Sequence, residues 1–196
     1  TITLELTKDK THKIFNVGLF QVLKGTVKNL TIDGSIEIDE PFQTNVGGLA
    51  GYMDCSNASI DNCISDVNIY LSGEDMQAGG LFGAINVSDG ELQIRNCKMT
   101  GLISMAGTNS ALAGLAAFSK GTVEISDCSV KGELWQTGAV SYVGGIVGNA
   151  YYSNFKAERC SVLGESRIEE AGRISGLANT SSASDLQIED CIVAGE

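Results

Sequence analysis

The sequence predicts an all-β protein: a right-handed parallel β-helix, or β-solenoid, of about six coils with a period of about 31 residues. A glycine-rich stretch and a cysteine motif both recur at nearly the same interval, and no copy contains a helical stripe with a cap and a stop. A fixed period in this range is typical of repeat architectures. The expected handedness follows from the general preference of crossover connections.

The first recurring element is a glycine inside an apolar run, as in VGGLAGY at 46–52. It recurs at steps of 30 to 34 residues, at Gly18, Gly48, Gly80, Gly114, Gly145 and Gly176. Glycine weakens strand interiors, so a column of glycines needs a steric reason. The column indicates either a sharp bend or a close approach to the opposite wall, and the sequence leaves both open.

The second recurring element is an alternating apolar segment that ends in Asn or Asp followed by Cys, as in VEISDC at 123–128. The cysteines are Cys63, Cys97, Cys128, Cys160 and Cys191. Leu30 takes their place in the first copy, which indicates a buried apolar position. We expect reduced structural thiols, because parallel Cβ vectors in a stacked column suit a disulfide poorly. Cys55 lies outside the column, in an expected turn where its thiol can be exposed.

Two further columns flank the cysteines. An interior stack is predicted for Ile60, Ile94, Ile125, Ala157 and Ile188. A corner is predicted at the column Asn29, Asn62, Asn96, Asp127 and Asp190, with Arg159 as the exception, because Asn and Asp tolerate left-handed backbone angles. A third alternating segment follows each cysteine, so each repeat holds about three short strands. Propeller blades need about 40 residues and four strands, which favours the solenoid.

The combination of GGLAG or GGLFG with a later I-x-N-C and a V-x-G strand resembles the GLUG repeat, over about Phe15 to Gly195. GLUG repeats occur in bacterial surface proteins, including adhesin-like proteins of gut commensals and the N-terminal regions of IgA-specific metallopeptidases. The resemblance implies a β-solenoid at the cell surface or in a secreted protein. It does not imply peptidase activity, since the chain has one histidine, His12, and no HExxH motif.

Composition and length are consistent with one solenoid domain at 15–196, preceded by an N-terminal strand or cap segment at 1–14. We expect the chain to be a fragment of a longer protein whose uncapped ends could self-associate. The net charge of −11 disfavours nucleic acid and anionic membranes as partners. No apolar run reaches 18 residues, so no membrane insertion is expected. No cofactor or metal site is predicted.

One outward column is the candidate binding face. Seven residues after the cysteine column, the sequence places Glu37, Tyr70, Ser104, Trp135 and Arg167. Tyr70, Trp135 and Arg167 are the candidate ligand-binding residues, because exposed aromatic rings on a rigid wall can stack on sugars or anchor a protein. A second aromatic group comprises Tyr142, Tyr151 and Tyr152. For each group, a half-buried aromatic covering a loop is the simpler interpretation.

No catalytic residues are predicted. The column two residues before the cysteines holds one adjacent acid pair, Glu158 and Glu189, and a solvated ladder explains it better than glycosidase chemistry. The favoured function is a non-enzymatic surface or secreted module that serves as an adhesin-like binding scaffold or spacer, with a host glycan or protein as its ligand. The alternative is a carbohydrate-active β-helix enzyme or a carbohydrate-binding module.

Overall fold

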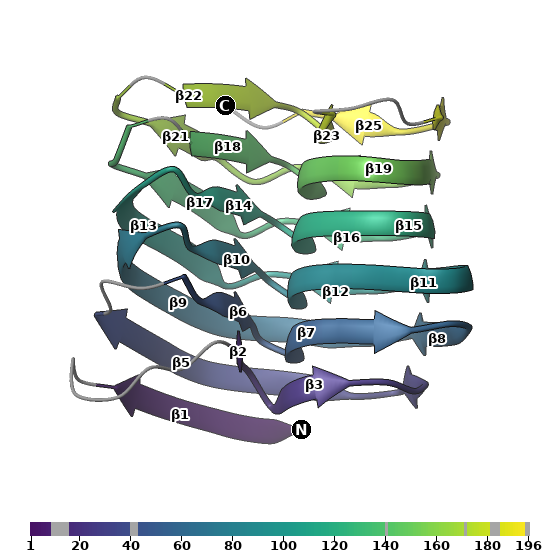
Figure 1. Cartoon of the computed structure of the whole chain (residues 1–196), viewed down its shortest axis with the longest axis horizontal. Coiled ribbons are helices and arrows are strands. Elements are labelled where there is room, and N and C mark those ends of the chain that lie inside the picture. Colours follow the sequence, from purple (N-terminus) through teal and green to yellow (C-terminus); the bar gives the residue numbers. More distant parts are fainter. Residues whose placement is uncertain (9–15, 40–42, 140, 171, 181–184, 195–196) are drawn as a thin grey trace.

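The computed structural model describes residues 1–8, 16–39, 43–139, 141–170, 172–180 and 185–194. The described residues form strands and no helix, and the strands stack as a parallel β-solenoid with a period of about 32 residues. Figure 1 shows the turns stacked in chain order from one end to the other. The predicted fold class is confirmed, although the stack amounts to about five turns where the sequence suggested about six coils.

Each turn contributes strands to three walls. Wall A consists of β1 (Ile2–Lys8), β5 (Thr31–Asp39), β9 (Ile64–Glu74), β13 (Leu102–Thr108), β17 (Glu133–Gln136) and β21 (Ser166–Ile168), extended by the short strands β12 (Lys98–Met99), β16 (Ser129–Val130), β20 (Ser161–Val162) and β25 (Ile192–Val193). Wall B consists of β2 (Asn16–Val17), β6 (Asn45–Gly47), β10 (Gln77–Gly79), β14 (Ala111–Ala113), β18 (Ser141–Gly144) and β22 (Gly172–Ser175). Wall C consists of β3 (Phe20–Leu23), β7 (Ala50–Cys55), β11 (Phe82–Arg95), β15 (Ala116–Ser126), β19 (Val147–Glu158) and β23 (Ala178–Thr180), with β4 (Val27–Lys28), β8 (Ala58–Asp61) and β24 (Leu186–Glu189).

Strand β1 lies beneath the first full turn on wall A. It pairs in parallel with β5 from Ile2 opposite Ile32 to Lys8 opposite Ile38. Residues 9–15, which include the end of the predicted N-terminal segment, lie outside the described part of the chain.

The core is the continuous interior of the solenoid. Inward side chains from all three walls form one cluster that includes the predicted stack. Ile60, Ile94, Ile125 and Ala157 pair in register and are buried, whereas Ile188 in the last turn is exposed. Each rung therefore covers the apolar residues of the rung beside it, which is how a repeat too small to fold alone acquires a core.

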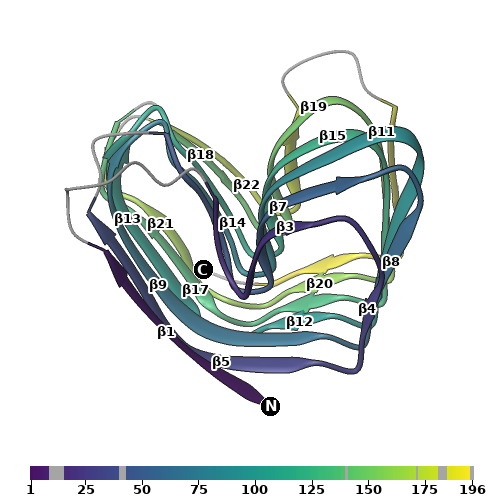
Figure 2. The same cartoon turned by 60° about the horizontal axis from the view of Figure 1, so that its bottom comes forward.

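The glycine column sits where walls B and C fold inward toward wall A, as the cross-section in Figure 2 shows. None of its described members has a left-handed backbone, so close approach is the reason for glycine. A β-carbon on Gly80 would stand 2.3 Å from Met99 Cγ, and one on Gly114 would stand 2.4 Å from Val130 Cγ2. Real β-carbons essentially never make contacts this short. Of the two explanations that the sequence left open, a sharp bend and a close approach, the close approach is therefore the correct one.

The glycines directly before the central one and three residues after it, such as Gly79 and Gly83 around Gly80, are required for a different reason. A β-carbon on Gly79 would stand 2.1 Å from the Phe82 carbonyl oxygen, and one on Gly83 would stand 2.4 Å from the Val46 nitrogen. These two columns therefore bring the backbones of walls B and C together. Other turns place different small or polar residues in these two columns: Ala113, Ala117, Ser175 and Asn179. Only the central column is glycine in every full copy.

The first copy differs from the others at this bend. Val17 pairs with Val46 and Phe20 with Ala50, so two residues span the bend in the first copy where three span it in the second. Gly18 alone therefore occupies the part of the bend that Gly47 and Gly48 occupy together in the second copy.

The predicted corner is confirmed in every copy. Each member of the column has a positive φ, between 50° and 57°: Asn29, Asn62, Asn96, Asp127, Arg159 and Asp190. Side chains also bond along the column, with Asn62 Nδ2 donating to Asn29 Oδ1 at 2.8 Å and Arg159 Nε donating to Asp127 Oδ1 at 2.7 Å. Asn96 departs from this pattern, because its Nδ2 donates to Asp61 Oδ1 at 3.0 Å.

Candidate functional site

The candidate binding face is a ladder on the outer surface of wall A. Its strands alternate in burial, so that Ile36, Ile69 and Ile103 point into the core and their neighbours point outward. The paired strands bring together all five residues that the sequence had aligned. From one rung to the next they are Glu37, Tyr70, Ser104, Trp135 and Arg167.

The two aromatic rings of this ladder are accessible to a ligand. Tyr70 is 41% exposed and Trp135 is 37% exposed. One rung, that of Ser104, separates them, so their backbones lie about 9.6 Å apart at the usual strand spacing. The guanidinium carbon of Arg167 lies 5.9 Å from the centroid of the Trp135 ring. This cation–π contact orients both side chains and places a positive charge beside the ring.

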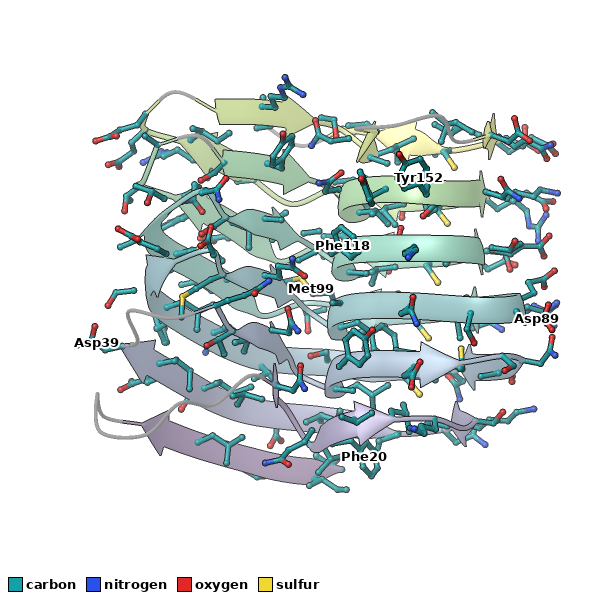
Figure 3. All side chains as sticks on the ribbon, viewed as in Figure 1. Phe20, Asp39, Asp89, Met99, Phe118 and Tyr152 are labelled. Atoms are coloured by element: carbon teal, nitrogen blue, oxygen red, sulfur yellow. The ribbon has the colours of Figure 1, made fainter. Side chains whose placement is uncertain are left out.

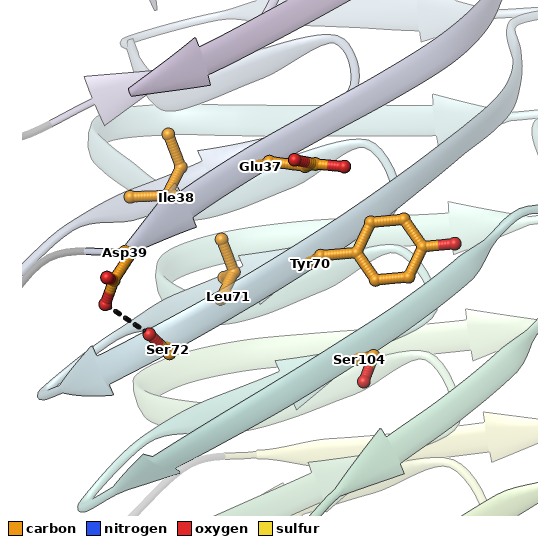
Figure 4. A pocket seen from close by; sticks show the side chains of 7 residues that line it. All are labelled: Glu37, Ile38, Asp39, Tyr70, Leu71, Ser72 and Ser104. Atoms are coloured by element: carbon orange, nitrogen blue, oxygen red, sulfur yellow. Dashed lines mark hydrogen bonds between the residues drawn. The ribbon is translucent and has the colours of Figure 1, made fainter. Parts of the chain in front are cut away.

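A shallow depression of about 340 Å³ adjoins Tyr70 on the same wall. Figure 4 shows its lining: Glu37, Ile38, Asp39, Tyr70, Leu71, Ser72 and Ser104. The Ser72 hydroxyl donates to Asp39 Oδ1 at 2.5 Å. The depression thus combines one aromatic ring with carboxylates and hydroxyls, which are groups that bond the hydroxyls of a polar ligand.

The acid pair Glu158 and Glu189 stacks in register at one corner of wall C. Cations engage Glu158, since Lys156 Nζ lies 3.4 Å from one of its oxygens and Arg159 contacts the other. The hydrogen bond from Arg159 also lowers the pKa of the neighbouring Asp127 carboxyl. The bases at this corner thus favour charged carboxylates, as the lowered pKa of Asp127 shows, whereas a general acid needs a raised pKa.

The cysteine column is a ladder of thiol hydrogen bonds. The structure holds all six cysteines as free thiols, and the column is buried except at Cys191. Each thiol donates to the carbonyl two residues before it and to one on the preceding turn, as Cys128 Sγ does to Ser126 at 3.2 Å and to Ile94 at 3.6 Å. Among the described residues, no three His, Cys, Asp or Glu side chains group closely enough to hold a metal ion.

The expectation for Cys55 is wrong. Cys55 ends strand β7 and is only 5% exposed. The sequence predicts a turn at Cys55, outside the cysteine column. In fact the strand pairs with β11 as far as Cys55 opposite Val87, which carries the thiol into the core. Burial, with a smaller contribution from Asp54, raises the pKa of this thiol.

The second predicted aromatic group is divided between two walls. On wall C, the rings of Tyr151 and Tyr152 meet at 4.4 Å between centroids, and Tyr151 lies 6.1 Å from Phe118. Tyr142 lies on wall B, with the Arg173 guanidinium 5.4 Å from its ring centroid. Sequence reasoning missed Phe118 and the polar surface beside Tyr152. The doubled tyrosine, which interrupts strict alternation in β19, was the available signal.

Scans of the chain against protein-family models, curated proteins and solved structures returned no match. Within the described residues, no helix is long and apolar enough to cross a membrane.

Proposed function

We propose that this protein is a non-enzymatic repeat module that acts as a binding scaffold, with the outer ladder of wall A as its ligand face. The observation that supports the proposal most is the direct register of Tyr70, Ser104, Trp135 and Arg167 on a rigid wall. The ladder fixes the backbone positions of both rings, so binding a ligand would cost little ordering of the backbone.

The chemistry of this face suits a glycan. A sugar ring has a flat carbon face that stacks on Tyr or Trp and a rim of hydroxyls that bonds polar side chains. The depression at Tyr70 supplies Glu37 and Ser104 beside the ring. An extended glycan lying along the solenoid axis would meet Tyr70 and Trp135 in turn, with Arg167 beside the second ring for an acidic sugar.

The proposed cellular location of the module rests on its sequence motifs. The GLUG-like repeats, together with the acidic charge, support a location on the surface of a bacterium or in its secreted proteins, and an adhesin-like or spacer role. The expected ligand is a host glycan or a host protein.

A carbohydrate-active enzyme is the alternative function. It has less support, because the acid pair Glu158 and Glu189 lies on wall C, and Lys156 and Arg159 engage Glu158. On wall A, the two carboxylates beside Tyr70, Glu37 and Asp39, come from the same strand, β5, and Asp39 accepts a hydrogen bond from Ser72.

A glycan and mucin array tests the proposal. The purified protein should bind a subset of glycans, and Trp135→Ala should weaken that binding at least tenfold. Leu163→Ala is a control, since Leu163 is exposed outside the ladder. Absence of binding at high protein concentration would remove the ligand role and leave the spacer role. Release of shortened sugars from a bound glycan would favour the enzyme instead.

A further inference from the structure

A second candidate surface lies on wall C, where strand β19 carries a β-bulge relative to strand β15. Ser119 pairs with Ala150 and Gly121 pairs with Ser153. Tyr151 and Tyr152 therefore both stand opposite Lys120. Bulges of this kind occur where a strand redirects a side chain, often beside a functional site.

Tyr152 adopts a backbone conformation that is costly for a bulky residue. Its φ is 47°, in the left-handed region. In the two preceding turns the residues with positive φ near this position are glycines, Gly90 at 78° and Gly121 at 93°, and Gly121 pairs with Ser153, the residue after Tyr152. Glycine would adopt the conformation without strain, so the fold gains nothing from tyrosine here. Strain of this kind is characteristic of sites where a side chain serves binding.

The next residue along β19 holds the strained tyrosine firmly in place. Ser153 is buried, and its hydroxyl donates to the Ser119 carbonyl at 2.8 Å. The two serine hydroxyls also lie 3.3 Å apart. This buried anchor fixes the strand directly after Tyr152, so the tyrosine is presented in a defined position rather than on a loose turn.

The bulge presents an aromatic platform to solvent. Tyr152 is 58% exposed, and Figure 3 shows it on the outer face of the solenoid with Phe118 on the adjoining turn. Tyr151 connects the two, edge-to-face with Tyr152 and near Phe118. The platform therefore joins the exposed ring of Tyr152 to a neighbouring ring, Tyr151, that contacts it.

A polar depression of about 230 Å³ begins on the same strand two residues after Tyr152, at Asn154. Asn154 and Lys156 occupy alternate positions of β19 after Tyr152 and point outward. The depression is lined by Thr122, Glu124, Asn154, Phe155, Lys156, Asp185 and Gln187. Its charged residues are Glu124, Asp185 and Lys156, and Lys156 also pairs with Glu158 at 3.4 Å. The depression has no excess positive charge, so it favours a neutral ligand rich in hydroxyls over an anionic one.

We propose that the Tyr152 bulge and the adjoining depression form a saccharide-binding site. A pyranose ring would stack on the exposed face of Tyr152, and its hydroxyls would bond the Asn154 amide, the Glu124 carboxylate and the Lys156 ammonium. The depression is smaller than the roughly 300–1,000 Å³ typical of enclosed ligand pockets, so it accommodates one ring of a longer chain. This site is on wall C and is independent of the ladder on wall A.

Solution NMR on the isotope-labelled chain tests the proposal directly. The probes are cellohexaose, chitohexaose and mannohexaose, three soluble hexasaccharides with different ring faces. At millimolar concentration, at least one should shift the resonances of Tyr152, Asn154 and Lys156 in a saturable way. If none of the three shifts these resonances, or if only wall A responds, the proposal is overturned.

Two variants separate binding from folding. Tyr152→Gly removes the ring and also relieves the strained backbone, so its melting temperature should equal or exceed that of the wild type while affinity falls at least tenfold. Asn154→Ala, at an exposed strand position, should weaken binding several-fold. Tyr142→Ala on wall B is the matched control and should bind normally. Unchanged affinity in Tyr152→Gly or in Asn154→Ala would overturn the site.

The result is distinguishable from the test of the proposed function. Binding lost in Trp135→Ala but retained in Tyr152→Gly supports the wall A ladder and overturns the wall C site. The reverse pattern supports the wall C site alone.

Discussion

Gly80 packs directly against the side chain of Met99 on wall A. A β-carbon on Gly80 would stand 2.3 Å from Met99 Cγ and equally close to the Gly114 carbonyl oxygen. The side chain of Met99 can shift, but the backbone carbonyl belongs to the next rung and cannot move without breaking the ladder. The central glycine is therefore required by distance and not by backbone angle.

Gly80→Ala should lower the free energy of unfolding by about 1–3 kcal/mol, the range for overpacking a tight core. Gly25→Ala is the control, because no atom lies within 4 Å of the position its β-carbon would take. That control should leave stability unchanged or raise it by up to about 1 kcal/mol. Urea unfolding monitored by circular dichroism measures both variants, and equal effects would contradict the close-approach account.

Asn96→Ala should destabilise the protein by about 1–2 kcal/mol, because alanine adopts the left-handed angle of 54° poorly. Asn96→Gly should recover most of that loss, since glycine reaches this angle freely. Thermal unfolding of the two variants compares them. If glycine proved as harmful as alanine, the hydrogen bond from Asn96 to Asp61 would be the main contribution instead.

Thiol labelling at neutral pH should distinguish the last turn from the rest. Cys97 and Cys128 are buried in the ladder and should resist a maleimide, whereas the partly exposed Cys191 should react first. All six cysteines should react after denaturation. Mass spectrometry of timed samples identifies the labelled peptides. Rapid native labelling of Cys97 would be incompatible with the stacked interior.

Stability should fall as the pH rises above about 9. Burial raises the pKa of the Cys55 thiol above its usual value of about 9.0, and the neighbouring Cys97 thiol together with burial raises that of Cys63. The folded chain keeps these protons at a pH where the unfolded chain loses them, so alkali favours unfolding. The contribution is fully present below pH 9. Cys55→Ala should show a shallower decline in denaturant midpoint between pH 8 and 10.

The contact between Arg167 and Trp135 should be visible in fluorescence, because Trp135 is the only tryptophan of the chain. Arg167→Ala uncovers the ring and should increase quenching by acrylamide. Arg167→Lys keeps a cation and a long stem near the ring and should behave more like the wild type. Identical quenching in the wild type and in Arg167→Ala would show that the cation–π contact does not persist in solution.

The periodic features were predictable because each is repeated. A single Asn before a cysteine says little, but six positions in register indicate a shared backbone angle, and even Arg159 adopts it. The outward ladder followed from the same alignment, since adjacent rungs place equivalent residues side by side.

Features that occur in one turn only were not predictable in this way. The end of β7 depends on its pairing with β11, which keeps Cys55 in the core despite the turn-like residues after it. The bulge at Tyr152 depends on one extra residue relative to Lys120, and its depression is assembled from three neighbouring strands. No local pattern in the sequence shows which residues will meet there.

The backbone hydrogen bonds of all three walls join one turn to the next and therefore run along the solenoid axis. A force applied between the two ends loads these bonds turn after turn, so the molecule should yield stepwise by peeling its outermost turn. Each turn released adds about 100 Å of extended chain, since an extended residue spans about 3.3–3.6 Å. In the proposed spacer role, the molecule would therefore lengthen in steps under tension before all of its turns had unfolded.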